Sequence, residues 1–236
     1  MRFEYSYVGN LDNAIRGLRH PYESYKKSDS GHQCKENPEE ICKGNCFKAN
    51  LEKFIIGKND LDLCQRMIKA GSPNDKFLRQ IFVSVDITAP LYWWKELDTY
   101  KVATTTNSTS TMHKIATTPI TKDCFETGDY QMDFAFVDEL ISFCEGLRLK
   151  YLETKDLDYW KELIRWLPES WLQTRTWTGN YAVLRNILRW RKNHKLKYEW
   201  DSFIRWCQFL PYSQELLFYE NGYNNYEIHE LLTSKK

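Results

Sequence analysis

The chain has 236 residues, of which 42% are hydrophobic and 15% aromatic, and this composition is enough to build a substantial core. Its 33 Lys and Arg residues balance 32 Asp and Glu residues, and the formal charge of +1 argues against general binding to nucleic acid. No Pro- or Gly-rich linker divides the sequence, so we expect one domain over residues 1–236.

The segment 1–8 lacks the apolar stretch of a secretion signal, and no apolar run approaches the ~18 residues of a membrane-spanning helix. The cysteine count of seven is odd. Four cysteines lie in apolar or helical stretches, which favours reduced thiols over disulfides; they are Cys64, Cys124, Cys144 and Cys207. We therefore expect a soluble, cytoplasmic protein that binds neither nucleic acid nor membrane.

The first third of the chain contains most of the expected strands. Aromatic and polar residues alternate over 1–8, which predicts a strand, and FIIG at 54–57 is a second, shorter candidate. The polar segment at about 20–52 is expected to be an irregular excursion. Capping residues and helical spacing predict a helix over 60–70. Alternating β-branched residues make 79–88 the best strand.

Helices dominate the remainder. Apolar residues at helical spacing predict them over 90–101, about 134–152, 156–167, 179–193 and 197–210. Because strands come early and helices late, the sequence indicates an α+β fold with a helical C-terminal half.

A hydroxyl-rich segment, TTTNSTSTMHK (104–114), follows the aromatic helix at 90–101. Hydroxyls and backbone N–H groups can surround a phosphate, with Lys101, His113 and Lys114 adding positive charge. A merely solvated loop is the alternative interpretation.

The predicted helix at 179–193 carries polar residues within an apolar stripe. Asn180, Leu184, Ile187 and Arg191 share that stripe, and Asn186 lies about a third of a turn away. A half-buried arginine needs an anionic or acceptor partner. That partner is either a ligand or a neighbouring carboxylate such as Glu199.

Four residues early in the chain have side chains that bind zinc in other proteins: His32, Cys34, Cys42 and Cys46. Their spacing is irregular and lacks the paired two-residue knuckles of zinc sites. A reduced polar loop is favoured, and we expect no metal.

Residues 94–114 resemble the signature segment of the flavin-dependent thymidylate synthases. That signature reads Arg-His-Arg, two residues, Ser, one residue, Asn-Glu, one residue, Ser, one residue, Arg. Asn107 and Ser110 retain its Asn-x-x-Ser core. The Arg-His-Arg triplet is replaced by a stretch with the single cation Lys101, and Ser108 and Met112 stand in place of the Glu and the last Arg.

A second motif of the same family is closer to its pattern. Its matching residues are Leu167, Pro168, Thr174, Arg175, Asn180, Asn186, Arg191 and Glu199. The resemblance spans roughly residues 54–212. It implies a thymidylate synthase-complementing-like fold, with a small antiparallel sheet flanked by helices, assembled as a homotetramer with active sites between subunits.

The family methylates dUMP, with methylenetetrahydrofolate as carbon donor, FAD as hydride carrier and NADPH as a further co-substrate. The resemblance assigns flavin binding to Lys101, Asn107, Asn180, Ala182 and Asn186. It assigns substrate binding to Glu96, Ser108, Thr109, Ser110, Arg165 and Arg191, with Arg191 as the catalytic residue facing the uracil. The alternatives are a non-catalytic nucleotide-binding or structural homo-oligomer of the same fold, and an unrelated α+β interaction protein.

Overall fold

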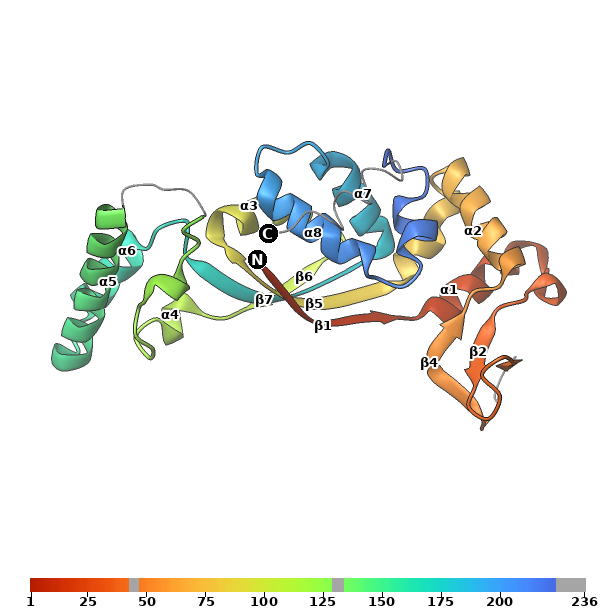
Figure 1. Ribbon diagram of the computed structural model, residues 1–236, viewed down its shortest axis with the longest axis horizontal. Coiled ribbons are helices and arrows are strands. Elements are labelled where there is room, and N and C mark those ends of the chain that lie inside the picture. Colours follow the sequence, from red (N-terminus) through yellow and green to blue (C-terminus); the bar gives the residue numbers. More distant parts are fainter. Residues whose placement is uncertain (43–46, 129–133, 224–236) are drawn as a thin grey trace. The chain divides into compact units, whose positions relative to one another are not determined.

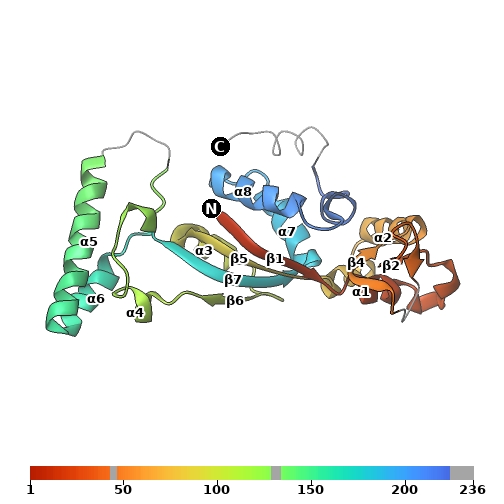
Figure 2. The same cartoon turned by 60° about the horizontal axis from the view of Figure 1, so that its bottom comes forward.

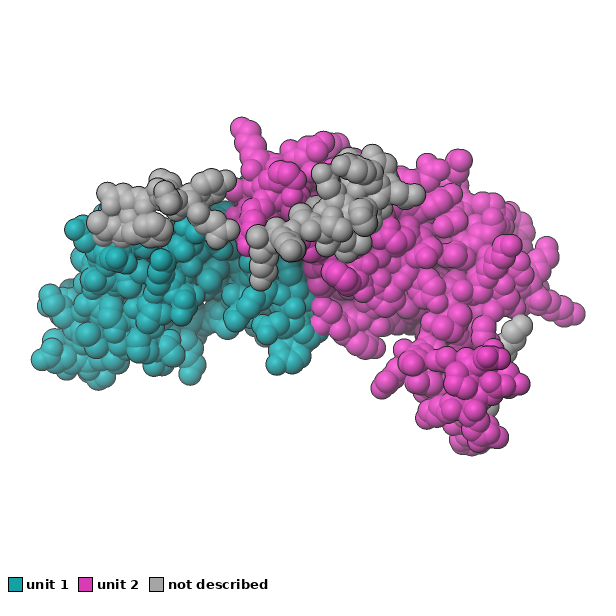
Figure 3. All heavy atoms as spheres, viewed as in Figure 1, with its two compact units in different colours: residues 1–5, 85–101, 106–177 teal, residues 6–84, 102–105, 178–236 magenta. Residues whose placement is uncertain are grey.

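The computed structural model describes residues 1–42, 47–128 and 134–223 (Figure 1). The chain divides into two compact units (Figure 3). Unit 1 comprises Met1–Tyr5, Val85–Lys101 and Thr106–Trp177, and unit 2 comprises Ser6–Ser84, Val102–Thr105 and Thr178–Lys236. Helices and small sheets are both present, which confirms the α+β class. That the whole chain is one domain stays a prediction. No helix among the described residues is long and apolar enough to cross a membrane.

Four strands form the larger sheet, in the order β1-β5-β7-β6. They are β1 (Arg2–Gly9), β5 (Phe82–Pro90), β6 (Thr105–Ser108) and β7 (Leu172–Asn180). The strands expected at 1–8 and 79–88 are confirmed, although residues 79–80 close the 3-10 helix η3 (Asn74–Gln80) instead. The alternation in β5 predicted its burial correctly, because Val83, Val85 and Ile87 are buried.

Strands β6 and β7 were not expected. Strand β7 carries Thr on one side, and these hydroxyls bond to polar side chains of β5. Thr174 lies 2.7 Å from the Thr88 hydroxyl, and Thr176 donates to Asp86 over 2.5 Å. Cross-strand polar pairs of this kind stabilise a sheet without an apolar pattern on that face.

Unit 1 holds α3 (Leu91–Leu97), α4 (Thr111–Lys114), η4 (Lys122–Cys124), α5 (Phe134–Thr154) and α6 (Leu157–Trp166). Helices α5 and α6 lie side by side (Figures 1 and 2). They confirm two of the expected helices. Helix α3 is shorter than expected, because Thr99 bonds to the Glu96 carbonyl just beyond its end. Six residues form one core cluster: Ile115, Ile120, Phe125, Cys144, Leu147 and Leu163.

Unit 2 holds α1 (Leu11–Leu18), η1 (His20–Tyr22), η2 (Tyr25–Lys27), α2 (Lys58–Ala70), α7 (Tyr181–Arg191), α8 (Lys197–Gln208) and the π-helix η5 (Ser213–Phe218). Helices α2 and α8 confirm the expectations at 60–70 and 197–210. Helix α7 begins two residues later than expected because Gly179 and Asn180 still belong to β7.

The excursion at 20–52 is not irregular throughout, and that expectation was wrong for three segments. Strands β2 (Gly31–Cys34), β3 (Ile41–Cys42) and β4 (Ala49–Ile55) form an antiparallel sheet in the order β3-β2-β4. Strands β2 and β4 lie beside α1 (Figure 2). Gly31 permits the close approach of β3, since a Cβ there would lie 2.5 Å from Ile41 Cγ2.

A buried carboxylate joins the excursion to α2. Asp60 Oδ2 accepts hydrogen bonds from the Ser28 and Ser30 hydroxyls, each over 2.6 Å, and Asp60 Oδ1 accepts from Arg19 Nε over 2.7 Å. Asp29, which lies between these two serines, accepts hydrogen bonds from the backbone N–H groups of Asn59 and Asp60 at the start of α2. We call Arg19, Ser28, Ser30 and Asp60 the Asp60 cluster.

The Asp60 cluster lowers the pKa of its carboxyl group. Burial raises the pKa of Asp60, but the hydrogen bonds from Ser28, Ser30 and Arg19 together outweigh burial. The folded-state pKa therefore lies below the unfolded value. The stabilisation is complete above the unfolded pKa of ~3.9 and is lost as the pH falls through the folded pKa.

Asp60→Asn should lower the free energy of unfolding by about 3–5 kcal/mol at pH 7, because Arg19 keeps a buried charge without its carboxylate. Urea unfolding at pH 7 and below pH 4 measures the effect, and the difference from wild type should narrow in acid. The matched control Asp62→Asn removes an exposed ion pair with Arg66 on the same helix and should change stability by at most ~0.5 kcal/mol. A difference that did not vary with pH would contradict this account of Asp60.

Candidate functional site

Residues 106–114 of the hydroxyl-rich segment lie in unit 1, where β7 partly orders them, and Thr104 and Thr105 belong to unit 2. After the exposed strand β6, the Thr109 backbone N–H donates to the Thr174 carbonyl over 2.9 Å, and Gln173 Nε2 donates to the Thr109 carbonyl over 2.9 Å. Ser110 then caps α4 by accepting the His113 N–H. The segment is thus not merely a solvated loop, since its backbone is bonded on both sides of Thr109.

Arg175 organises the part of β7 that holds this segment. Its guanidinium donates to both Asp98 oxygens over 3.0 and 3.2 Å and to Gln173 Oε1 over 2.9 Å. Its Cζ lies 4.4 Å from the centroid of the Trp94 ring, and Trp94 Nε1 donates to the Gln173 carbonyl. We call Trp94, Asp98, Gln173 and Arg175 the Arg175 cluster. It fixes the same Gln173 that bonds Thr109.

The other residues predicted for unit 1 differ in exposure. Lys101, Asn107, Ser108 and Thr109 are exposed, whereas Glu96 and Ser110 are half-buried. Arg165 is exposed on α6 and forms an ion pair with Glu162, one turn away on the same helix. Arg165 is therefore already neutralised by its own helix, and its role toward substrate stays a prediction.

The predicted stripe on α7, in unit 2, has the expected burial. Asn180 is buried at the end of β7 and caps the helix by accepting the Val183 N–H over 3.0 Å. Leu184 and Ile187 are fully buried. Ala182 is half-buried, and Asn186 is exposed, with its Oδ1 accepting a bond from Trp190 Nε1.

Arg191 ends α7 and is half-buried, with its Cζ 5.0 Å from the centroid of the Trp200 ring. A cation at this distance from an aromatic ring is attracted by the ring's π electrons. Glu199, the alternative partner, is buried. The contact with the Trp200 ring supports the guanidinium group, and the pairing with Glu199 stays a prediction.

Arg185, which the sequence analysis did not single out, is the buried cation of α7. Its Nη1 donates to the carbonyls of Leu216, Leu217 and Tyr219 over 2.7–2.9 Å, at the end of η5. Burial lowers the pKa of Arg185 to about 10. Its signal in the sequence was its position one residue after Leu184, inside the buried face of the helix.

Among the described residues, no three His, Cys, Asp or Glu side chains gather closely enough to hold a metal ion. Cys46, one of the four candidate zinc ligands, lies outside those residues. His32 instead contacts the Phe54 ring, with centroids 5.2 Å apart.

Solved structures similar to this chain are those of flavin-dependent thymidylate synthases. Thymidylate synthase X (ThyX) from Helicobacter pylori, with FAD and dUMP, is 17% identical over 94% of this chain and 99% of that chain, with a TM-score of 0.66. A second structure of the H. pylori enzyme with the same ligands is 16% identical over 93% and 99%, with a TM-score of 0.66. The UMP/dUMP methylase PolB from Streptomyces cacaoi, bound with 5-Br dUMP, is 13% identical over 80% and 76%, with a TM-score of 0.47.

No protein-family model matches the sequence, and a comparison with curated proteins gives no match. The similarity to the H. pylori enzyme nevertheless covers nearly the whole length of both chains. The chain therefore has the fold of a flavin-dependent thymidylate synthase. The particular fold is that of ThyX, which confirms the fold that the two motifs implied.

Arg175→Lys should loosen the hydroxyl-rich segment, because an ammonium group cannot bond Asp98 and Gln173 together while stacking on Trp94. We expect a loss of about 1–3 kcal/mol in stability and faster hydrogen exchange at the Thr109 amide. Lys95→Gln, which removes an exposed ion pair with Glu169 in the same unit, is the control and should change neither. If the Thr109 amide exchanged at the wild-type rate in Arg175→Lys, the Arg175 cluster would not be what orders the hydroxyl-rich segment.

Proposed function

We propose that this protein transfers a one-carbon unit from methylenetetrahydrofolate to the uracil ring of dUMP, with FAD as hydride carrier and NADPH as reductant. The proposal is supported by the ThyX fold. It is also supported by the second motif, because Asn180, Asn186 and Arg191 all lie on or cap one helix, α7. The proposal makes the protein a cytoplasmic enzyme. The cysteines among the described residues are free thiols, as expected in a reducing compartment.

Arg191 is the proposed catalytic residue. Attack on the uracil ring builds negative charge on the heterocycle, and a guanidinium group that is already held in place stabilises that charge without reorganisation. Contact with the Trp200 ring provides such a support. The reaction requires no cysteine nucleophile, and burial raises the pKa of Cys64 to about 12, which keeps that thiol protonated.

Asn180, Ala182 and Asn186 would bind flavin together with Lys101 and Asn107. Of these, Asn186, Lys101 and Asn107 are exposed and can reach a ligand without displacing the core. When bound, FAD supplies the redox chemistry, and the protein supplies position and charge. The residues present fit a nucleotide cofactor, although Lys101 is the one cation among residues 99–112.

The hydroxyls of Ser108, Thr109 and Ser110 would line the phosphate and sugar of dUMP, and Glu96 and Arg165 would make further contacts to the nucleotide. Thr109 is suited to this because the Arg175 cluster holds its backbone while its side chain remains exposed. A segment whose backbone is already ordered loses little conformational entropy when a ligand binds.

Assembly as a homotetramer is part of the proposal. It is supported by large apolar side chains that α5 exposes on unit 1, including Phe136, Phe143 and Leu149. Exposed apolar side chains along one helix are typical of a surface that is covered in an oligomer.

The proposal predicts that the purified protein binds FAD and releases tritium from dUMP labelled at C5 when methylenetetrahydrofolate and NADPH are added. Flavin absorbance and calorimetry with dUMP measure the two binding steps separately from turnover. Binding of dUMP without FAD binding or turnover would refute the enzyme and support the alternative, a non-catalytic nucleotide-binding protein of the same fold. Absence of both would refute the whole proposal.

Arg191→Ala should lower kcat by about 10²–10³-fold, because it removes a charge that acts on the transition state. Arg189→Ala, which replaces an exposed arginine on the same helix, is the control and should stay near wild type. Light scattering should show that both variants remain tetramers. Wild-type turnover in Arg191→Ala would remove that residue from the catalytic role.

A further inference from the structure

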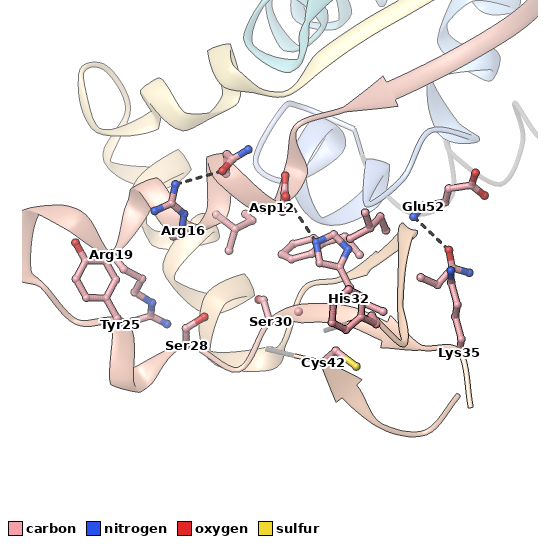
Figure 4. Close-up of a pocket in the computed structure, with 18 of the residues that line it drawn as sticks. Asp12, Arg16, Arg19, Tyr25, Ser28, Ser30, His32, Lys35, Cys42 and Glu52 are labelled. Atoms are coloured by element: carbon pink, nitrogen blue, oxygen red, sulfur yellow. Dashed lines mark hydrogen bonds and ion pairs between the residues drawn. The ribbon is translucent and has the colours of Figure 1, made fainter. Parts of the chain in front are cut away.

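A cavity of about 1690 Å³ lies within unit 2 and is lined by none of the residues assigned to the proposed reaction. One wall is the face of α1 that carries Asp12, Ile15 and Arg16 (Figure 4). The remaining lining comes from η2, from Ser28 and Ser30, from strands β2 and β4, and from Lys35, Cys42 and Phe47. This volume exceeds the ~300–1,000 Å³ of most small-molecule pockets.

The lining of the cavity has an excess of positive charge. Arg16, Lys26 and Lys35 line it, and no carboxylate within the described ranges forms an ion pair with any of them. Arg19, a fourth cation, is neutralised by Asp60. Two acidic residues, Asp12 and Glu52, oppose the three unpaired cations. The cavity therefore attracts anions.

The cations do not surround the cavity evenly. Arg16, Arg19 and Tyr25 lie to one side of His32, whereas Lys35 and Glu52 lie to the other (Figure 4). Tyr25, Ser28 and Ser30 also belong to the lining. The Ser28 and Ser30 hydroxyls already donate to Asp60, so Arg16 and Lys26 are the charged donors left to bind a phosphate.

The centre of the cavity is aromatic. The His32 and Phe54 rings meet edge to face, with centroids 5.2 Å apart, and Phe47 adds a fully exposed ring. His32 Nε2 lies 3.6 Å from Asp12 Oδ2, so the imidazole is orientated by a carboxylate. Its Nδ1 is buried and has no hydrogen-bond partner in the part of the chain that the structure describes. Aromatic faces next to a polar ring nitrogen suit a flat heterocycle.

The Asp60 cluster holds part of the cavity wall in place before a ligand binds. Ser28 and Ser30, which line the cavity, are each bonded to the Asp60 carboxylate, and Arg19 is bonded to it from α1's end. A wall whose side chains are already ordered requires little further ordering when a ligand binds.

We propose that the cavity is a second binding site, distinct from the proposed active site, for a small molecule that joins a phosphate group to an aromatic heterocycle, which is the chemistry of a mononucleotide. The phosphate contacts Arg16 and Lys26, and the heterocycle lies against His32 and Phe54. The site contains no residue assigned to the uracil chemistry and serves binding alone.

Calorimetry with AMP, GMP, CMP and UMP tests the proposal on the full chain, with adenosine and inorganic phosphate as the two separate parts of AMP. At least one mononucleotide should bind, and more tightly than either adenosine or phosphate. The double variant Arg16→Gln/Lys26→Gln should weaken that binding at least ~10-fold, by loss of two charge-assisted contacts. Both side chains are exposed, so the fold should be preserved.

Lys53→Gln is the matched control, because Lys53 is exposed on β4 but does not line the cavity, and it should leave binding within about twofold of wild type. Arg191→Ala changes the proposed active site and leaves the cavity lining intact, so it shows at which of these two sites a mononucleotide binds. Mononucleotide binding that survives Arg191→Ala but not the double variant supports the cavity site, whether or not the protein turns over dUMP. Absence of binding by all four mononucleotides, or binding that Arg191→Ala abolishes and the double variant does not, overturns it.

Discussion

The hydrogen bonds of Arg175 to Asp98 and Gln173 are the constraint on which the candidate nucleotide-binding segment depends. Residues 104–111 have small polar side chains, which bury almost no apolar surface. Ordering the backbone of such a segment costs about 1–2 kcal/mol of conformational entropy per residue. The hydrogen bond that Gln173 donates to the Thr109 carbonyl and the one that the Thr109 N–H donates to the Thr174 carbonyl offset part of that cost. The segment can then expose its hydroxyls because its order comes from the neighbouring strand.

Helix α7 in unit 2 follows the same principle with different residues. Its start is fixed by the Asn180 cap, and its buried face is fixed by Arg185, which bonds three carbonyls of the η5 region. Asn186 and Arg191 lie on this same helix, which presents them from a rigid support. In both units a buried or half-buried polar side chain carries the structural role. Side chains nearer the surface are thereby left for binding, as preorganised sites require.

Periodicity in the sequence predicted those elements whose stability depends on apolar burial. Helices α2, α5 and α6 and strand β5 repeat their apolar residues at regular spacing, so their positions were predictable. Strand β7 was not, because Thr residues on one face bond across to β5 and leave no apolar alternation. Thr at every second position was the available signal. Of the sheet β3-β2-β4, only the end of β4 at residues 54–55 was predicted, by the strand expected at 54–57. The rest escaped prediction because its short strands are polar and its neighbour Asp60 is distant in sequence.

The candidate site was predictable to a similar degree. Helical spacing placed Asn186 and Arg191 correctly on one helix, although Asn180 caps that helix from the end of β7. The partners of Arg175 are Gln173 of β7 and Asp98 just after α3, and no local sequence pattern predicts them. Where the family signature has Arg-His-Arg, this chain has Lys101 as the one cation among residues 99–112. Neutral hydroxyl bonds are about half as strong as charge-assisted ones. A segment that depends on them needs its donors held in place beforehand, and the Arg175 cluster provides that order at Thr109.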